Sequence, residues 1–192
     1  DPNFIAVDSS FRGGDADPDV FRIQPLFGLP QIDNATGPVR ILGASQVSFG
    51  GDTNPFGPEI VLDGSIADGA LGIPIRSDHV TIDSLVVNQF NGPGIDIFNA
   101  NHTLIINNYI GTDATGTIDQ GNTLQGVVIA GSNNVIGRPS EGNVISGNNQ
   151  DGVFILSGTH TGNVVQGNKI GTDVAGVAAI PNGFQDGNIL NG

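Results

Sequence analysis

The sequence predicts an all-β fold, a parallel β-helix in which short strands stack into a solenoid. Three observations support this prediction: the composition disfavours helices, a motif recurs along the chain, and like residues recur at matching positions of the repeats. Of 192 residues, 30 are Gly and 11 are Pro, whereas Glu and Lys together number only 3. Gly and Pro interrupt helices, and Glu and Lys are common surface helix formers, so an α-rich fold is excluded.

The second half of the chain contains an internal repeat. The segment NNYIGTDATG begins at Asn107, GNKIGTDVAG begins sixty residues later at Gly167, and the two match at six of ten positions. Asn is concentrated in the same half, with 3 in residues 1–87 and 17 in residues 88–192. Self-similarity of this kind is the sequence signature of a solenoid.

The repeating units begin with a Gly-apolar-x-Ile pattern. The starts are spaced by 22, 32, 26 and 35 residues and lie at Gly72, Gly94, Gly126, Gly152 and, less regularly, Gly187. Each unit contains three short β-branched runs separated by Gly and Asn turns, which predicts about three strands per coil. The extra length of the longer units follows the IGTD motif, at residues 114–125 and 174–186, which predicts a side loop at each place.

Consecutive coils stack about 4.8 Å apart, so equivalent residues lie directly above one another. This predicts two aliphatic core columns and one corner column: Ile82, Ile105 and Val165; Val87, Ile110 and Ile170; and Leu85, Asn108 and Asn168. At a corner, Asn amides can hydrogen-bond along the stack, and Asn tolerates the left-handed backbone conformation that corners require.

The first half of the chain is less regular. We expect residues 1–36 to form an N-terminal cap and entry segment, and residues 37–192 to form the coils. A cap is expected because the end of a solenoid exposes unpaired strand edges. Since the GNIL segment at Gly187 starts a further unit, we also expect the native chain to continue beyond Gly192.

Several motifs resemble a known repeat family. The segments IGTDATG, EGNVISGNN and GNVVQGNKIGTD are similar to the right-handed parallel β-helix repeats of large bacterial exported and cell-surface proteins. The resemblance covers roughly 170 of 192 residues. It implies a right-handed parallel β-helix (solenoid) and an extracellular or cell-surface location. It does not assign an activity, because lyases, hydrolases, tail spikes and adhesins share this fold.

The charge of the chain excludes some partners. Six basic and 19 acidic side chains give a net charge of −13, and the basic residues are scattered. Nucleic acid and anionic membranes would be repelled. The chain has no Cys, which excludes disulfides and thiolate sites. No apolar run approaches the roughly 18 residues of a membrane span, so none is expected.

The charged residues do not suggest a catalytic site. A polysaccharide lyase needs a basic side chain and a second cation beside the substrate carboxylate, but the candidates lie on three different units, at Arg76, Arg138 and Lys169. A hydrolase needs two carboxylates in one groove. The chain has no adjacent acidic pair, so only stacking between coils could bring together Asp83, Asp96 and Asp151.

Two features suggest metal ions. Asp15, Asp17 and Asp19 alternate as in the first half of a calcium loop, although the Gly and terminal Glu of an EF-hand are missing. The alternative is that Asp residues simply make turns. His79 and His102 fall at the same register of adjacent coils, with His160 less well aligned, so they form either a two-imidazole metal site or a solvated corner stack.

The IGTD loops, Thr112–Gly116 and Thr172–Gly176, are the most repeated feature. Thr and Asp after a strand-ending Gly favour a hydrogen-bonded turn over a ligand-binding loop.

These observations favour a non-catalytic structural or adhesive β-helix segment of a larger bacterial secreted or cell-surface protein. The alternative is a carbohydrate-active module, either a polysaccharide lyase or hydrolase, or a polysaccharide-binding β-helix. The partners expected are a polysaccharide or another surface protein. No catalytic residue and no required cofactor are assigned, and calcium at Asp15, Asp17 and Asp19 is the one ion considered.

Overall fold

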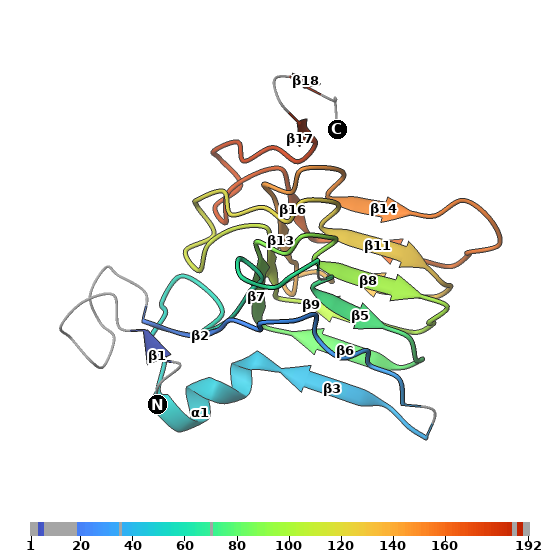
Figure 1. Cartoon of the computed structure of the whole chain (residues 1–192), viewed down its shortest axis with the longest axis horizontal. Helices are drawn as coiled ribbons and strands as arrows, with labels where there is room; N and C mark the ends of the chain where they lie inside the picture. Colours follow the sequence, from blue (N-terminus) through green and yellow to red (C-terminus); the bar gives the residue numbers. More distant parts are fainter. Residues whose placement is uncertain (1–3, 6–18, 35, 70, 186–187, 190–192) are drawn as a thin grey trace.

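A computed structural model describes residues 4–5, 19–34, 36–69, 71–185 and 188–189. Figure 1 shows short strands stacked in layers along one axis, with very little helix. Three of the sheets are built from parallel strands, apart from the first strand of one of them. This architecture confirms the predicted all-β, parallel β-helix fold.

The chain visits the three sheets in the same order in each coil, which we define as one strand of sheet A, then B, then C. Sheet A contains β2 (Val20–Ile23), β4 (Ile60–Asp63), β7 (Leu85–Asn88), β10 (Tyr109–Ile110), β13 (Val144–Ile145) and β16 (Lys169–Ile170). Sheet B contains β5 (Ile73–Ile75), β8 (Ile95–Phe98), β11 (Val127–Ala130) and β14 (Val153–Ile155). Sheet C contains β3 (Val39–Leu42), β6 (Val80–Asp83), β9 (Leu104–Ile106), β12 (Val135–Ile136) and β15 (Val164–Val165).

The remaining elements lie at the ends of the stack and in one connection. β1 (Phe4–Ile5) pairs antiparallel with β2, and β17 (Phe184–Gln185) pairs antiparallel with β18 (Asn188–Ile189). A 3₁₀ turn, η1 (Gly43–Gln46), and a short helix, α1 (Val47–Gly50), connect β3 to β4. β2 lies within the predicted cap and entry segment and pairs in parallel with β4. The predicted unit start at Gly187 lies outside the described residues.

The predicted columns are present, but each has more members than the sequence indicated, and the last predicted member of each, Val165 or Ile170, is exposed rather than buried in the core. Ile82 pairs with Ile105, and Ile136 stands between Ile105 and Val165. In the same way Ile145 stands between Ile110 and Ile170. The side chains of Ile82, Ile105, Ile136, Ile110 and Ile145 are fully buried. Apolar burial along these columns is the main force that holds the coils together.

Asparagine occupies all three corners of the solenoid, which extends the single corner column predicted. The three ladders are Asn108–Asn143–Asn168 between sheets C and A, Asn122–Asn148–Asn182 between A and B, and Asn134–Asn163 between B and C. Asn143 illustrates the pattern: its Oδ1 accepts the backbone N–H of Asn108 at 2.9 Å, and its Nδ2 donates to the Ile105 carbonyl at 2.9 Å and to Asn168 Oδ1 at 2.9 Å. One amide therefore bonds three coils and satisfies buried backbone groups that the turn leaves unpaired.

Candidate functional site: a cleft on the outer face of sheet A

The connection between β3 and β4, residues 43–59, folds over the outer face of sheet A, and we call it the roof segment. Between the roof segment and the sheet lies a cleft of about 690 Å³. Its floor is an outward-facing column of sheet A in which Tyr109, Val144 and Lys169 are neighbours on successive strands. This volume falls in the range of small-molecule and cofactor sites.

Three contacts hold the roof segment in place, and a fourth bond, between Asn54 and Pro58, lies within it. The Tyr109 hydroxyl donates to the Phe56 carbonyl, and Asn54 Nδ2 donates to the carbonyl of Ala114 at 2.9 Å and to that of Pro58 at 2.9 Å. Gly57 lies flat against the Tyr109 ring, where an added Cβ would come within 2.4 Å of a ring carbon. The roof segment is thus tied to the sheet and to a side loop sixty residues away in sequence, so the cleft is preformed rather than made by a mobile lid.

A buried carboxylate stiffens the base of the roof segment. Glu59 is 3% exposed, and its two carboxylate oxygens accept from the Thr53 N–H at 2.7 Å and the Thr53 hydroxyl at 2.9 Å. Hydrogen bonds to a carboxylate are stronger than bonds between neutral groups. Glu59 therefore serves the fold although it lines the cleft.

Tyr109 is neutral in the cleft. Burial, together with the nearby charge of Asp113, raises the pKa of its hydroxyl to about 12. The hydroxyl therefore keeps its proton and its bond to the Phe56 carbonyl throughout the physiological pH range.

Two charged groups in the cleft are unused by the fold. Among the residues that the structure describes, neither Lys169 nor Asp52 makes a side-chain hydrogen bond or an ion pair. Three arginines, by contrast, are paired with carboxylates. The ion pairs are Arg22–Asp63 at 2.6 Å, Arg76–Asp96 at 2.5 Å and Arg138–Glu141 at 3.8 Å. Lys169 and Asp52 are exposed and line the same cleft.

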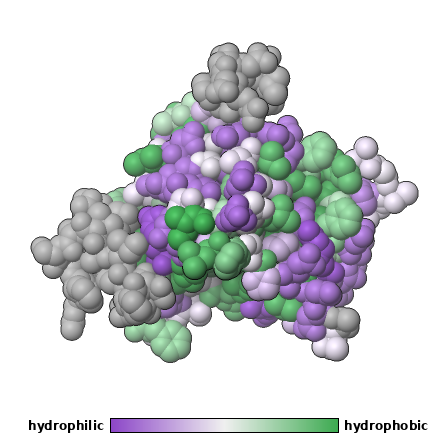
Figure 2. All heavy atoms as spheres, viewed as in Figure 1, coloured by the Kyte–Doolittle hydropathy of each residue, from purple (hydrophilic) through white to green (hydrophobic). Residues whose placement is uncertain are grey.

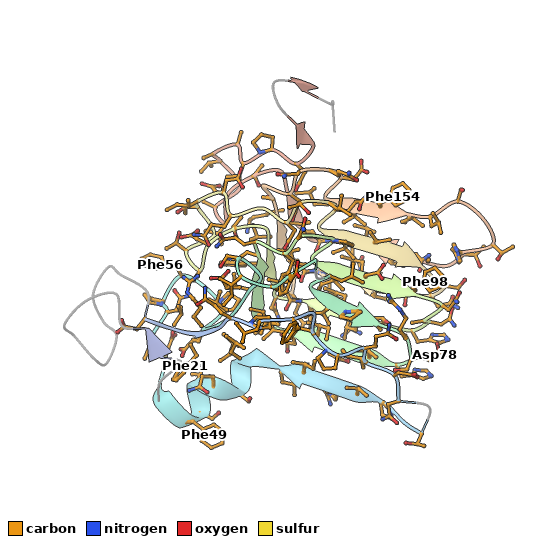
Figure 3. The ribbon with its side chains drawn as sticks, in the orientation of Figure 1. Phe21, Phe49, Phe56, Asp78, Phe98 and Phe154 are labelled. Carbon is orange, nitrogen blue, oxygen red and sulfur yellow. The ribbon has the colours of Figure 1, made fainter. Side chains whose placement is uncertain are left out.

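The aromatic side chains on the molecular surface lie on different sides. Figure 3 shows Phe56 of the roof segment on the side opposite Phe98 and Phe154, which belong to sheet B. The Arg76 guanidinium lies 5.5 Å from the centre of the Phe98 ring. Figure 2 shows hydrophilic side chains over much of the viewed face, with smaller hydrophobic groups between them.

The structure only partly describes the predicted calcium residues. Asp15 and Asp17 lie outside the described residues. The backbone N–H of Asp19 donates to the Thr53 carbonyl at 3.1 Å, which connects this position to the roof segment. Within the described part of the chain, no group of three or more His, Cys, Asp and Glu side chains is placed to hold a metal ion.

The predicted alignment of two histidines is confirmed. The His79 and His102 rings stack with centroids 5.0 Å apart and planes 7° apart. Both residues have left-handed backbone conformations, with φ of 60° and 56°, and the strand register continues their column to Asn133 and Gly162, which also have positive φ. The column selects residue types that tolerate this conformation, which favours the corner-stack alternative. His160 falls at the register of Gly131, outside the column.

The carboxylates considered for catalysis lie on different elements, as do the basic residues, and the one contact between the two sets is the Arg76–Asp96 ion pair at 2.5 Å among the described residues. Asp83 is on sheet C, where it accepts from Ser84 Oγ at 2.8 Å and Asn107 Nδ2 at 2.9 Å. Asp96 is on sheet B, and Asp151 lies in the turn before β14. Of the basic residues, Arg76 follows β5 of sheet B, and Lys169 is on sheet A.

The IGTD loops are hydrogen-bonded turns, as the sequence predicts. Asp113 Oδ1 accepts the N–H groups of Thr117 at 3.1 Å and Ile118 at 3.0 Å. In the second loop, Asp173 Oδ1 accepts the N–H of Val177 at 2.8 Å. This bond and further backbone N–H groups of the loop lower the pKa of Asp173 despite the opposing effect of burial. The two loops stack, since Val174 N–H donates to the Gly116 carbonyl at 2.9 Å.

One position of the sixty-residue repeat marks the floor of the cleft in the sequence, although the search for repeats did not identify it. Tyr109 and Lys169 are the only Tyr and the only Lys of the chain, and they occupy the same position of the sixty-residue repeat. The flanking Asn, Ile, Gly, Thr and Asp are identical in both copies, so this outward-facing position differs inside an otherwise identical run. Asp52 and Glu59 belong to the irregular roof segment and carry no such signal.

Comparison with protein-family models, curated proteins and solved structures gave no significant match. None of the helices in the described residues is long and apolar enough to cross a membrane.

Proposed function

We propose that the chain is a non-catalytic structural or adhesive β-helix segment of a larger bacterial secreted or cell-surface protein. One observation carries the proposal: the polar side chains that recur along the stack are bonded from coil to coil. The asparagine ladders at three corners use their amides in this way, as Asn108, Asn143 and Asn168 do. A chain whose recurring polar side chains hydrogen-bond adjacent coils to one another is suited to be a stiff spacer or display rod.

The distribution of carboxylates further supports a non-catalytic role. Asp83 and Asp96 lie on different sheets, and each is bonded within the fold. Glu59, the buried carboxylate of the cleft, is held by Thr53. General acid and base catalysis needs carboxyl groups that face one substrate and can exchange protons with it.

A polysaccharide-binding or carbohydrate-active module is the second candidate, and the cleft over sheet A favours it. The cleft combines an exposed aromatic residue, Phe56, with the unused charged groups of Lys169 and Asp52. Such combinations of an apolar wall and a few polar groups are typical of ligand sites. An extracellular or cell-surface location and calcium at Asp15, Asp17 and Asp19 remain predictions from the sequence.

The test is incubation of the full chain with a panel of neutral and uronate polysaccharides. Assays for reducing ends and for unsaturated products then measure hydrolysis and elimination, respectively. We expect neither product above the level of a heat-denatured control. Product release by the chain, lost when Lys169 or Asp52 is replaced, would contradict the non-catalytic proposal and support the carbohydrate-active alternative.

A further inference from the structure

We propose that the cleft over sheet A binds a neutral, hydroxyl-rich glycan chain. The proposal rests on the adhesive role proposed above and names the ligand class of that site. Lys169 supplies hydrogen-bond donors and Asp52 supplies acceptors, and neither group is used by the described fold. Sugar hydroxyls both donate and accept, so a glycan can satisfy both groups at once.

The apolar part of the cleft fits the face of a sugar ring that presents C–H groups. Phe56 is 41% exposed at the cleft, and Val144 lies on the floor between Tyr109 and Lys169. Because the Tyr109 hydroxyl is already bonded to the Phe56 carbonyl, the roof segment needs little reordering when a ligand enters. A preorganised site loses less conformational entropy on binding.

A peptide fits this cleft less well than a glycan. Peptides commonly bind sheets by adding a strand to a free edge. β10 and β13, which form most of the floor, are internal strands of sheet A and are paired on both sides. A peptide in the cleft would therefore cross these strands and find no free backbone groups on them.

Charge selects a neutral glycan over a uronate polymer. Among the described residues that line the cleft, three side chains are charged: Asp52 and Glu59 are acidic, and Lys169 is basic. The whole chain carries a net charge of −13. A polyanionic chain would be repelled at long range and would meet a locally negative site, whereas an uncharged polyol avoids both costs.

The experiment measures binding of the full chain by isothermal titration calorimetry. The probes are neutral oligosaccharides of glucan, mannan, xylan and chitin type, with polygalacturonate and alginate oligosaccharides as the charged comparison. We expect at least one neutral probe to bind and the uronates to bind more weakly, with the difference reduced at high salt because screening weakens the repulsion.

Variants locate the site. Lys169→Gln and Asp52→Asn should each weaken binding of the neutral probe about tenfold, because each loses hydrogen bonds to a charged group. The matched controls Arg40→Gln and Asp68→Asn make the same charge changes at exposed positions outside the cleft and should leave the affinity unchanged. Circular dichroism checks that each variant is folded.

Three outcomes would overturn the proposal: no neutral probe binds the folded chain, a uronate binds more tightly than every neutral probe, or the control variants weaken binding as much as the cleft variants. Cleavage of a bound probe would contradict the non-catalytic role and leave the binding site intact. Absence of binding would remove the site and leave the structural role standing, so the two proposals fail separately.

Discussion

Replacement of Ile105 by Ala tests the stacking of the core most directly. Ile105 is 0% exposed and lies between Ile82 and Ile136, which are also 0% exposed. The change removes about three methylene equivalents, or roughly 2.4 kcal/mol of burial at about 0.8 kcal/mol each. The Ile105 carbonyl accepts from Gly137 N–H at 2.8 Å and from Asn143 Nδ2 at 2.9 Å. The backbone is therefore held and cannot collapse into the cavity left by the truncated side chain. The cavity raises the expected loss in unfolding free energy to about 3–4 kcal/mol.

The same column supplies the control. Val165 continues the register of Ile105 and Ile136 but is 39% exposed, so Val165→Ala should cost only about 1 kcal/mol. Urea denaturation followed by circular dichroism gives both free energies. Equal losses of unfolding free energy for the two substitutions would contradict the expectation that burial along the column determines stability.

Hydrogen exchange adds a spatial test of the Ile105→Ala variant. Each coil contacts chiefly its neighbours, so protection should fall first in β6 and β12, the strands that pair with β9. A rise in exchange confined to residues 19–36 would show that the register of sheet C does not transmit the damage.

Three further changes probe the corners, an ion pair and a side loop. Asn143→Ala should cost about 2–3 kcal/mol in urea denaturation, because it leaves the buried N–H of Asn108 without its acceptor. Burial acts to raise the pKa of Asp63, but hydrogen bonds from Ser65 and the Arg22 guanidinium together lower it below its ordinary value. The ionised Asp63 carboxylate therefore stabilises the fold above its unfolded pKa of about 3.9, and this stability is lost as the pH falls through the lower folded pKa. The difference in unfolding free energy between wild type and Asp63→Asn should shrink below about pH 4. A free-energy difference that grows below that pH would show that the folded pKa is not lowered. Asp119→Ala removes an exposed side chain with one hydrogen bond, to Gly121 N–H at 3.0 Å, and should change stability by less than about 0.5 kcal/mol in thermal denaturation.

The fold could be predicted because its stabilising interactions repeat in sequence. Stacked coils place equivalent residues in columns, so local patterns such as Gly-apolar-x-Ile report directly on long-range pairing. The predicted starts at Gly72, Gly94, Gly126 and Gly152 each precede a strand of sheet B in mutual register. The same logic aligned His79 with His102, which the structure confirms.

The missing members of the columns have a physical cause. The sixty-residue repeat spans two coils, since β13 lies between β10 and β16 in sheet A. The intervening coil has the sequence SGNN, beginning at Ser146, at this corner and has no side loop there. The coils on either side have the IGTD motif at the same corner, followed by a side loop. Matching IGTD to IGTD therefore skipped Ile136, Ile145 and Asn143, although the corner function of Asn143 is the same.

The cleft could not be predicted in the same way. It exists because the roof segment, which has no periodic pattern, is bonded to residues far away in sequence, such as Asn54 to Ala114. Position in the repeat identifies Tyr109 and Lys169 as outward-facing, but nothing local tells which loop will cover them. Only the tertiary structure shows that Asp52 and Lys169 line one space.

The two faces of sheet A explain how such a scaffold can carry a binding site at little cost to its stability. The inward column at Val87, Ile110 and Ile145 is aliphatic and fully buried, and any truncation there creates a cavity. The outward column passes from Tyr109 through Val144 to Lys169, three chemically unlike side chains on neighbouring strands. Because strand pairing depends on the backbone and the inward face, the outward position can change without disturbing the stack, even though Tyr109 and Val144 are buried there. Recognition in this molecule is therefore expected to reside in the outward column and its roof segment, while the inward columns and asparagine corners maintain the rod.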